Sequence, residues 1–211
     1  MRDIKFKKIS LEDKEIIDLY INKYYPSCLS AFTFSSLISW VDFYNYEWAI
    51  SDETLLIKFT DSEDKKEYLF QPIGEFPLSL QEEIIRYAEG LDYKIKIHGV
   101  SEEFISKYPE FSSHFKIESR RDMDNYIYSA DDLAELKGGN YQPKRNLIKQ
   151  FESNYNWTSE LISLDNISAC FEVISGAHKQ NEISKDTSLD SELAALEFVL
   201  KNFAQLGSRG F

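Results

Sequence analysis

Cysteine and histidine are scarce in this sequence of 211 residues. Its two cysteines, Cys28 and Cys170, lie far apart and in no Cys-x-x-Cys arrangement, so neither a zinc site nor a redox pair is indicated. The three histidines, His98, His114 and His178, are isolated, and the chain contains neither a His-x-x-x-His nor a Gly-x-Ser-x-Gly motif. We therefore predict no metal site, surface or packed roles for the histidines, and a location in the reducing cytoplasm.

Long apolar runs and an excess of positive charge are also missing. No apolar run approaches the ~20 residues that a membrane-spanning helix needs, and the N-terminus lacks the apolar core of a signal peptide. The 24 Lys and Arg residues are outnumbered by 36 Asp and Glu residues, which gives a net charge of −12. A broad nucleic-acid surface needs clustered cations, so we predict no membrane span, no DNA partner, and only local sites for anions.

The composition is that of an ordinary globular protein, with 43% hydrophobic and 28% charged residues. Residues 4–9 alternate like a short strand, and Ser10 with Asp13 can cap the helix that follows as far as Pro26. Apolar residues at helical spacing from Phe34 to Tyr44 predict a second helix. The opening is therefore expected to be strand, helix, helix.

A three-stranded meander is predicted next, over residues 48–51, 55–60 and 67–71, which polar turns separate. Ser79 and Glu82 suggest a capping box for a helix to about Glu89, with Gly90 at its end. A strand at 93–97, a helix at 101–108 and strands at 115–119 and 125–128 complete the predicted order. This mixed α/β order resembles the GCN5-related N-acetyltransferase (GNAT) fold, a mixed sheet with helices on both faces.

The opening pattern then recurs. Residues 9–13 (Ile-Ser-Leu-Glu-Asp) and 162–166 (Ile-Ser-Leu-Asp-Asn) share a strand-to-helix junction, and two helices are predicted after it, near 167–180 and 189–206. The alternative is that Ser-Leu-Asp is simply a common helix cap. The repeat predicts a complete GNAT-like unit over residues 1–129, a helical connector over 130–156, and a partial second unit over 157–211.

The second unit, as predicted, lacks the meander and the third helix of the first. Its last helix would then carry apolar residues that are partly without a sheet to cover. These residues are Leu193, Leu196, Phe198, Val199 and Phe203. We expect either a homodimer through this C-terminal helix or disorder after about Ser184.

Two cations stand where a helix is predicted to begin, after a short helix over 131–136. The first turn of a helix is locally positive, so Lys144 and Arg145 there favour a bound anion, with Asn146 as a neutral donor. Pro143 suits the first helical position. Alternatively, the helix begins earlier and these cations pair with Asp131, Asp132 or Glu135. The same helix is expected to turn Leu147, Ile148, Phe151 and Tyr155 toward a core.

Three further residues are candidates for facing a substrate. Asp124, Tyr126 and Tyr128 alternate along a predicted strand, so they share one face and could orient an amine. Packing in the sheet is the alternative explanation for Tyr128. The turn over residues 71–79 has one glycine, two prolines and Glu75, which is a poor phosphate loop, so the first unit is not expected to bind CoA.

The chain resembles a bacterial family of unknown function that is related to the cytoplasmic C-terminal domain of phosphatidylglycerol lysyltransferase. The resemblance rests on Phe34-x-x-Leu37-x-x-Trp40 with Tyr44 and Trp48, on Pro72-Ile73-Gly74, on residues 126–129 with Asp132 and Leu133, on Leu136-Lys137-Gly138, and on Lys144-Arg145-Asn146 with Phe151. It implies two GNAT-type units in tandem. The Lys-Arg-Asn helix is also similar to a segment of the peptidoglycan-bridge aminoacyltransferases.

Relatives of that family move an aminoacyl group from aminoacyl-tRNA onto an amine or hydroxyl of a lipid or peptide. The resemblance thus implies an acyl- or aminoacyltransferase-like protein with acyl-CoA or aminoacyl-tRNA as the donor, whose phosphate Lys144 and Arg145 would bind. Transfer onto lipid is not expected, because the sequence lacks the membrane portion of the lipid-modifying enzymes. No general base can be named. The alternatives are a non-catalytic binding module and an inactive, truncated piece of a longer transferase.

Overall fold

The computed structural model describes residues 1, 4–25, 30–121, 124–181 and 187–211, with the side chains of 177–181 and 187–189 left undescribed. Cys28, Pro26 and the side chain of His178 therefore lie outside the described residues. Contacts divide the chain into two compact units. The first comprises Met1–Ser119 and Ser168–Ser208, and the second comprises Arg120–Ile167 and Arg209–Phe211.

A mixed sheet of six strands forms the centre of the first unit. The strands are β1 (Lys7–Lys8), β2 (Glu47–Ser51), β3 (Thr54–Thr60), β4 (Glu67–Phe70), β5 (Ile73–Gly74) and β6 (Ile97–His98). Their order is β1-β2-β3-β4-β6, with β5 paired to β3; the β4–β6 pair is parallel and the other pairs are antiparallel. The predicted mixed α and β class and the meander are confirmed.

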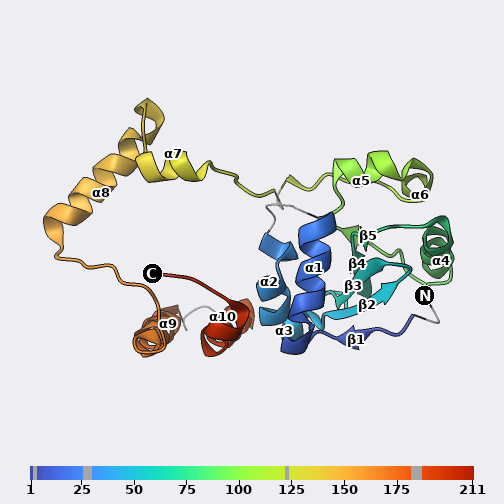
Figure 1. Cartoon of the computed structure of the whole chain (residues 1–211), viewed down its shortest axis with the longest axis horizontal. Helices are drawn as coiled ribbons and strands as arrows, with labels where there is room; N and C mark the ends of the chain where they lie inside the picture. Colours follow the sequence, from blue (N-terminus) through green and yellow to red (C-terminus); the bar gives the residue numbers. More distant parts are fainter. Residues whose placement is uncertain (2–3, 26–29, 122–123, 182–186) are drawn as a thin grey trace. The chain divides into compact units, whose positions relative to one another are not determined.

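Helices cover both faces of this sheet (Figure 1). The first face is covered by α1 (Lys14–Tyr24), α2 (Phe34–Ser39) and α3 (Val41–Tyr44), and the second by α4 (Leu78–Glu89), α5 (Glu102–Lys107) and α6 (Pro109–Ser113). Alternation along β3 places Leu55 and Ile57 in the first core and Leu56 in the second. The described residues of the first unit therefore form one core on each side of the sheet.

Helix ends follow the local sequence in part. The capping box of Ser10 and Asp13 is confirmed: the Asp13 carboxylate accepts a hydrogen bond from the Ser10 backbone N–H at 2.9 Å. The predicted capping box of Ser79 and Glu82 is wrong, because α4 begins at Leu78 after Pro77. The helix predicted over residues 34–44 is divided at Trp40 into α2 and α3.

The predicted strands at 115–119 and 125–128 are wrong, since neither segment pairs with another strand among the residues that the structure describes. The strand predicted at 93–97 is confirmed only at Ile97, because β6 covers Ile97–His98, and helix α6 was not predicted. Short apolar runs carry no information about whether a pairing edge is available, and pairing decides whether a strand forms.

The C-terminal helices are α9 (Ile167–Asn181), α10 (Thr187–Lys201) and α11 (Phe203–Leu206). Phe198 and Val199 on α10 pack against the first core, and Leu206 is buried in it. The expectation that this face is without cover is therefore wrong for Phe198 and Val199, because α10 packs on α2 instead of needing a sheet of its own. Leu196 remains 45% exposed.

The second unit holds α7 (Ala130–Glu135), α8 (Gln142–Asn154) and an extended segment that reaches Ile162. The Ile162 N–H donates to the Gly210 carbonyl at 2.9 Å, and the Ser163 N–H donates to the Asn166 side chain at 2.8 Å. The first unit contains the same pair of contacts, since the Ile9 N–H donates to the Tyr46 carbonyl at 3.1 Å just before the capping box. The two junctions thus share backbone pairing as well as sequence.

Candidate functional site

Arg145 lies in the first turn of α8, where its guanidinium closes the turn that follows α7. One nitrogen donates to the Leu136 carbonyl and, at 2.9 Å, to the Gly138 carbonyl; the other donates to the Gln142 side chain at 2.6 Å. Leu136 and Gly138 both have positive φ, so the carbonyls at the end of α7 turn toward this fork. Arg145 therefore stabilises the α7–α8 connection, which neither interpretation of the sequence anticipated.

Lys144 and Asn146 have different surroundings. The Asn146 side chain accepts a hydrogen bond from Gln142 at 2.8 Å, and both residues are exposed. Lys144 is exposed and forms no ion pair with any residue that the structure describes, so the expected partners Asp131, Asp132 and Glu135 do not hold it. Among the three predicted anion ligands, Lys144 therefore has the charged side chain that is most available to a ligand.

Replacing Arg145 with lysine should loosen the α7–α8 turn, because an ammonium has one nitrogen and cannot reproduce the planar arrangement in which one nitrogen holds the two carbonyls and the other holds the Gln142 side chain. The Leu136 N–H, which donates to the Asp132 carbonyl at 2.8 Å, should exchange about tenfold faster with solvent. Amide hydrogen exchange measures this directly. A Lys144→Ala variant is the control and should leave the exchange rate unchanged; the same rate in Arg145→Lys as in the parent would contradict the role of the fork.

The apolar face of α8 is exposed instead of buried, contrary to expectation. Leu147 is 65% exposed, Phe151 is 48% exposed and Tyr155 is 62% exposed. Together with Ile148, Glu152 and Trp157, two of these residues line a shallow groove of 610 Å³. The groove lies wholly within the second unit, beside the helix that carries Lys144.

The predicted substrate-facing row does not lie on a strand. Tyr126 is 89% exposed and Tyr128 is 54% exposed, and their rings stack with centroids 6.4 Å apart. Asp124 is exposed in the same irregular segment. Because this segment is no strand, the alternation that placed the three side chains on one face does not apply. Packing of Tyr128 in a sheet, the alternative explanation, is contradicted as well.

The parallel pair β4–β6 is where an open α/β sheet would offer a crevice at its strand ends. Here the pairing continues past β4, since the Gln71 N–H donates to the His98 carbonyl at 2.9 Å. The Gln71 side chain then accepts from the Ser101 N–H at 2.8 Å, while Phe32 packs on Phe70 with ring centroids 5.0 Å apart. The first unit therefore fills this crevice with its own side chains.

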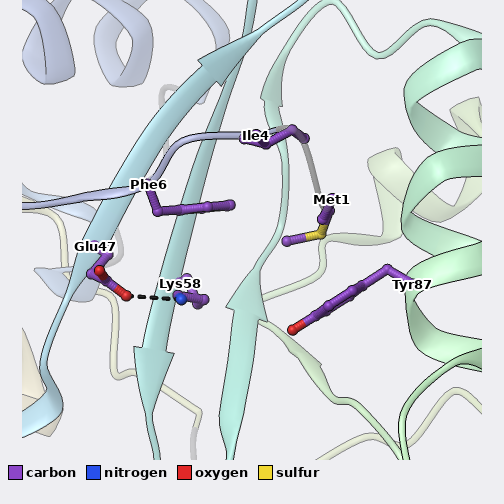
Figure 2. A pocket seen from close by; sticks show the side chains of 6 residues that line it. All are labelled: Met1, Ile4, Phe6, Glu47, Lys58 and Tyr87. Atoms are coloured by element: carbon purple, nitrogen blue, oxygen red, sulfur yellow. Dashed lines mark ion pairs between the residues drawn. The ribbon is translucent and has the colours of Figure 1, made fainter.

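A small pocket of 270 Å³ lies on the α4 side of the sheet (Figure 2). Its lining residues are Met1, Ile4, Phe6, Glu47, Lys58 and Tyr87. The Lys58 ammonium pairs with Glu47 at 2.8 Å and with Glu67 at 2.9 Å. Burial lowers the pKa of Lys58, but the hydrogen bonds to both carboxylates outweigh burial and raise it.

This charged pocket was not predicted, although Lys58 between the apolar Ile57 and Phe59, with acids on both neighbouring strands, could have indicated it. Its lysine is already neutralised by two carboxylates, which tie β2, β3 and β4 together. The cluster therefore holds the sheet together.

Neither a metal site nor a membrane span is found in the described structure. Within residues 1, 4–25, 30–121, 124–181 and 187–211, no three His, Cys, Asp or Glu side chains gather closely enough to ligate a metal. Cys170 is a free thiol. Across the same part of the chain, the helices are too short or too polar to cross a bilayer.

Comparisons with known proteins identify the family of this chain. No curated protein matches the chain. The crystal structure of a conserved protein of unknown function from Bacteroides thetaiotaomicron VPI-5482 is 28% identical with a TM-score of 0.85, and the match covers 97% of this chain and 69% of that one. Residues 23–210 match the family described as phosphatidylglycerol lysyltransferase, C-terminal. The chain therefore belongs to the family of phosphatidylglycerol lysyltransferase C-terminal domains.

Proposed function

We propose that this chain is an acyl- or aminoacyltransferase-like protein that binds the phosphate of an anionic donor at the start of α8. The observation that carries the proposal is the exposed Lys144 ammonium in the first turn of a 13-residue helix, where the positive end of the helix dipole favours an anion. Arg145 fixes the turn beside it, and Asn146 offers a second polar group. In such a transfer the protein holds an activated ester beside an amine and stabilises the developing oxyanion.

The same proposal includes a tandem GNAT-like architecture. The matching contacts at Ile9 and Ile162 support it, as do the matching endings of the two helix pairs. Each four-residue helix, α3 and α11, is followed by a residue in the left-handed conformation, Asn45 or Gly207. An extended segment that leads into a capped turn, followed by a helix pair of the same form, thus occurs twice, which is expected of a duplicated unit.

Donor binding is tested by titrating inorganic phosphate, CoA and an aminoacyl-tRNA analogue against the parent and two variants. Lys144→Ala should weaken binding about tenfold, because a charge-assisted contact to phosphate is lost. Lys149→Ala removes the same charge from another face of α8 and should bind as the parent does. Equal binding by Lys144→Ala and Lys149→Ala would refute the site.

The second candidate is a non-catalytic binding module. The closed crevice at β4 and β6 favours it, because Gln71 and Phe32 fill the place where the first unit would hold a cofactor. On this alternative, phosphate, CoA and the tRNA analogue all fail to bind the parent protein, and the GNAT-like unit serves only as a folded scaffold.

A further inference from the structure

The second unit leaves the apolar face of α8 without cover. None of the side chains that the structure describes in this unit is buried, and Leu147, Ile148 and Phe151 are 65%, 45% and 48% exposed. The rings of Phe151 and Trp157 are in contact, with centroids 6.1 Å apart, so they present one continuous apolar surface. Exposed apolar patches of this kind usually mark an interaction surface.

Two opposite charges lie on the same face of the helix. Lys144, Ile148 and Glu152 are spaced by four residues, so they follow one another along the helix surface with Ile148 in the middle. Leu147 and Phe151 fill the remainder of this face, and the ring of Tyr155, just past the end of α8, packs on Phe151 with centroids 5.1 Å apart. The face is therefore apolar at its centre, positive toward the start of α8 and negative toward its end, and its charges are complementary to a copy of itself turned end to end.

We propose that the α8 face, defined by Lys144, Leu147, Ile148, Phe151, Glu152 and Tyr155, is the contact between two copies of this chain. In an antiparallel pair of α8 helices with its two-fold axis at Ile148, Lys144 of each copy lies level with Glu152 of the other. The two ion pairs form together because a two-fold contact is reciprocal. Elsewhere the net charge of −12 makes two copies repel each other, so such local pairing selects this face.

Mass measurement by light scattering, combined with sedimentation to give the dimer dissociation constant, tests this contact on the full chain. Lys144→Glu places two acids opposite each other twice in a homodimer, and Glu152→Lys does the same with two lysines. Each variant alone should dimerise at least about tenfold more weakly than the parent. An equimolar mixture of the two should regain the dimer, since each of the two charge pairs across the axis then joins one acid to one lysine again.

Lys149→Glu, which changes a charge on another face of α8, is the matched control and should dimerise as the parent does. Circular dichroism of each variant checks that the helices are retained. A parent that stays monomeric, a dimer that neither charge change weakens, or a mixture that does not regain the dimer would each overturn the proposal. In the dimer the Lys144 ammonium is paired with Glu152 of the other copy, so dimerisation and donor binding compete for it. The readout is mass in the absence of donor, so the result stands whether or not donor binding at Lys144 fails.

Discussion

Replacing Gly74 with alanine is expected to lower the free energy of unfolding of the first unit by about 3 kcal/mol or more. Gly74 pairs with Thr54 in the β5–β3 ladder and has a φ of 134°, a conformation that L side chains rarely adopt. A methyl group there would be directed onto the backbone carbonyl of Glu53 and would lie 3.1 Å from the Thr54 Cα. Backbone atoms in a ladder cannot move aside without breaking the pairing.

Substitutions at two other glycines distinguish steric overlap from conformational strain as the cause of this loss of stability. Gly207 has a φ of 68° with nothing within 4 Å of an added Cβ, so Gly207→Ala should cost only the conformational strain, about 1 kcal/mol. Gly90 has an ordinary φ of −85°, and its Cβ would meet the Arg86 carbonyl at 3.4 Å, so Gly90→Ala should be nearly neutral. Urea unfolding of the three variants measures the series. If Gly74→Ala costs no more than Gly207→Ala, close approach of the backbone is not the reason for this glycine.

The reason for glycine at position 74 also bears on function, because a glycine between a strand and a helix can be mistaken for part of a phosphate loop. Glycine is required at position 74 because β5 lies close to β3. The segment that follows leads through Pro77 into α4. The turn therefore has a structural reason for glycine that requires no bound phosphate.

Much of the first unit could be predicted from local patterns. Alternation and polar turns predicted β2, β3 and β4, and apolar residues at helical spacing predicted α1, α2 and α4. These signals are reliable where both the element and its partner are close in the chain. The segments at 115–119 and 125–128 have strand-like composition, but composition does not supply a neighbouring edge, and neither segment forms a strand.

The helix that carries the candidate site was predicted, but the contacts of its first turn were not. The helix beginning near Pro143 is confirmed as α8, whereas the partners of Arg145 are two backbone carbonyls that no side-chain pattern reveals. Likewise, the spacing of Leu147 and Phe151 predicts an apolar face without saying what covers it. Lys58 was missed because its two partners lie on separate strands, so recognising the cluster requires the register of the sheet.

The other large effect is expected at Asp13, whose replacement by alanine should destabilise the first unit by about 2–3 kcal/mol at neutral pH. The buried carboxylate accepts from the Lys7 ammonium at 2.7 Å, from the Ser10 N–H at 2.9 Å and from the Ser10 hydroxyl at 3.0 Å. Burial raises the pKa of Asp13, but the hydrogen bonds from Lys7 and Ser10 outweigh burial and leave it lowered. Removing Asp13 would leave its three donors without this acceptor.

Because the folded pKa of Asp13 lies below the ordinary value of 3.8, the carboxylate stabilises the fold above that pH, and this contribution is lost as the pH falls through the folded pKa. The difference in unfolding free energy between the parent and Asp13→Asn, measured by urea unfolding, should therefore shrink in acid. Asp13→Asn removes the charge but keeps one acceptor oxygen for the cap, so the difference measures the contribution of the charge. A difference that does not change between neutral and acid pH would contradict the charge argument.

Asn166 gives the matching test in the second junction, where its amide oxygen replaces the carboxylate and accepts from the Ser163 N–H at 2.8 Å. This cap is exposed and neutral, so Asn166→Ala should raise the hydrogen exchange rate of the Ser163 amide only about fivefold, with no pH dependence in the ratio. Asn166→Asp should restore protection above the ordinary pKa of an aspartate. If Asn166→Ala leaves the Ser163 amide protected, the two junctions do not share a capping mechanism, and the support that they give to a duplicated unit is withdrawn.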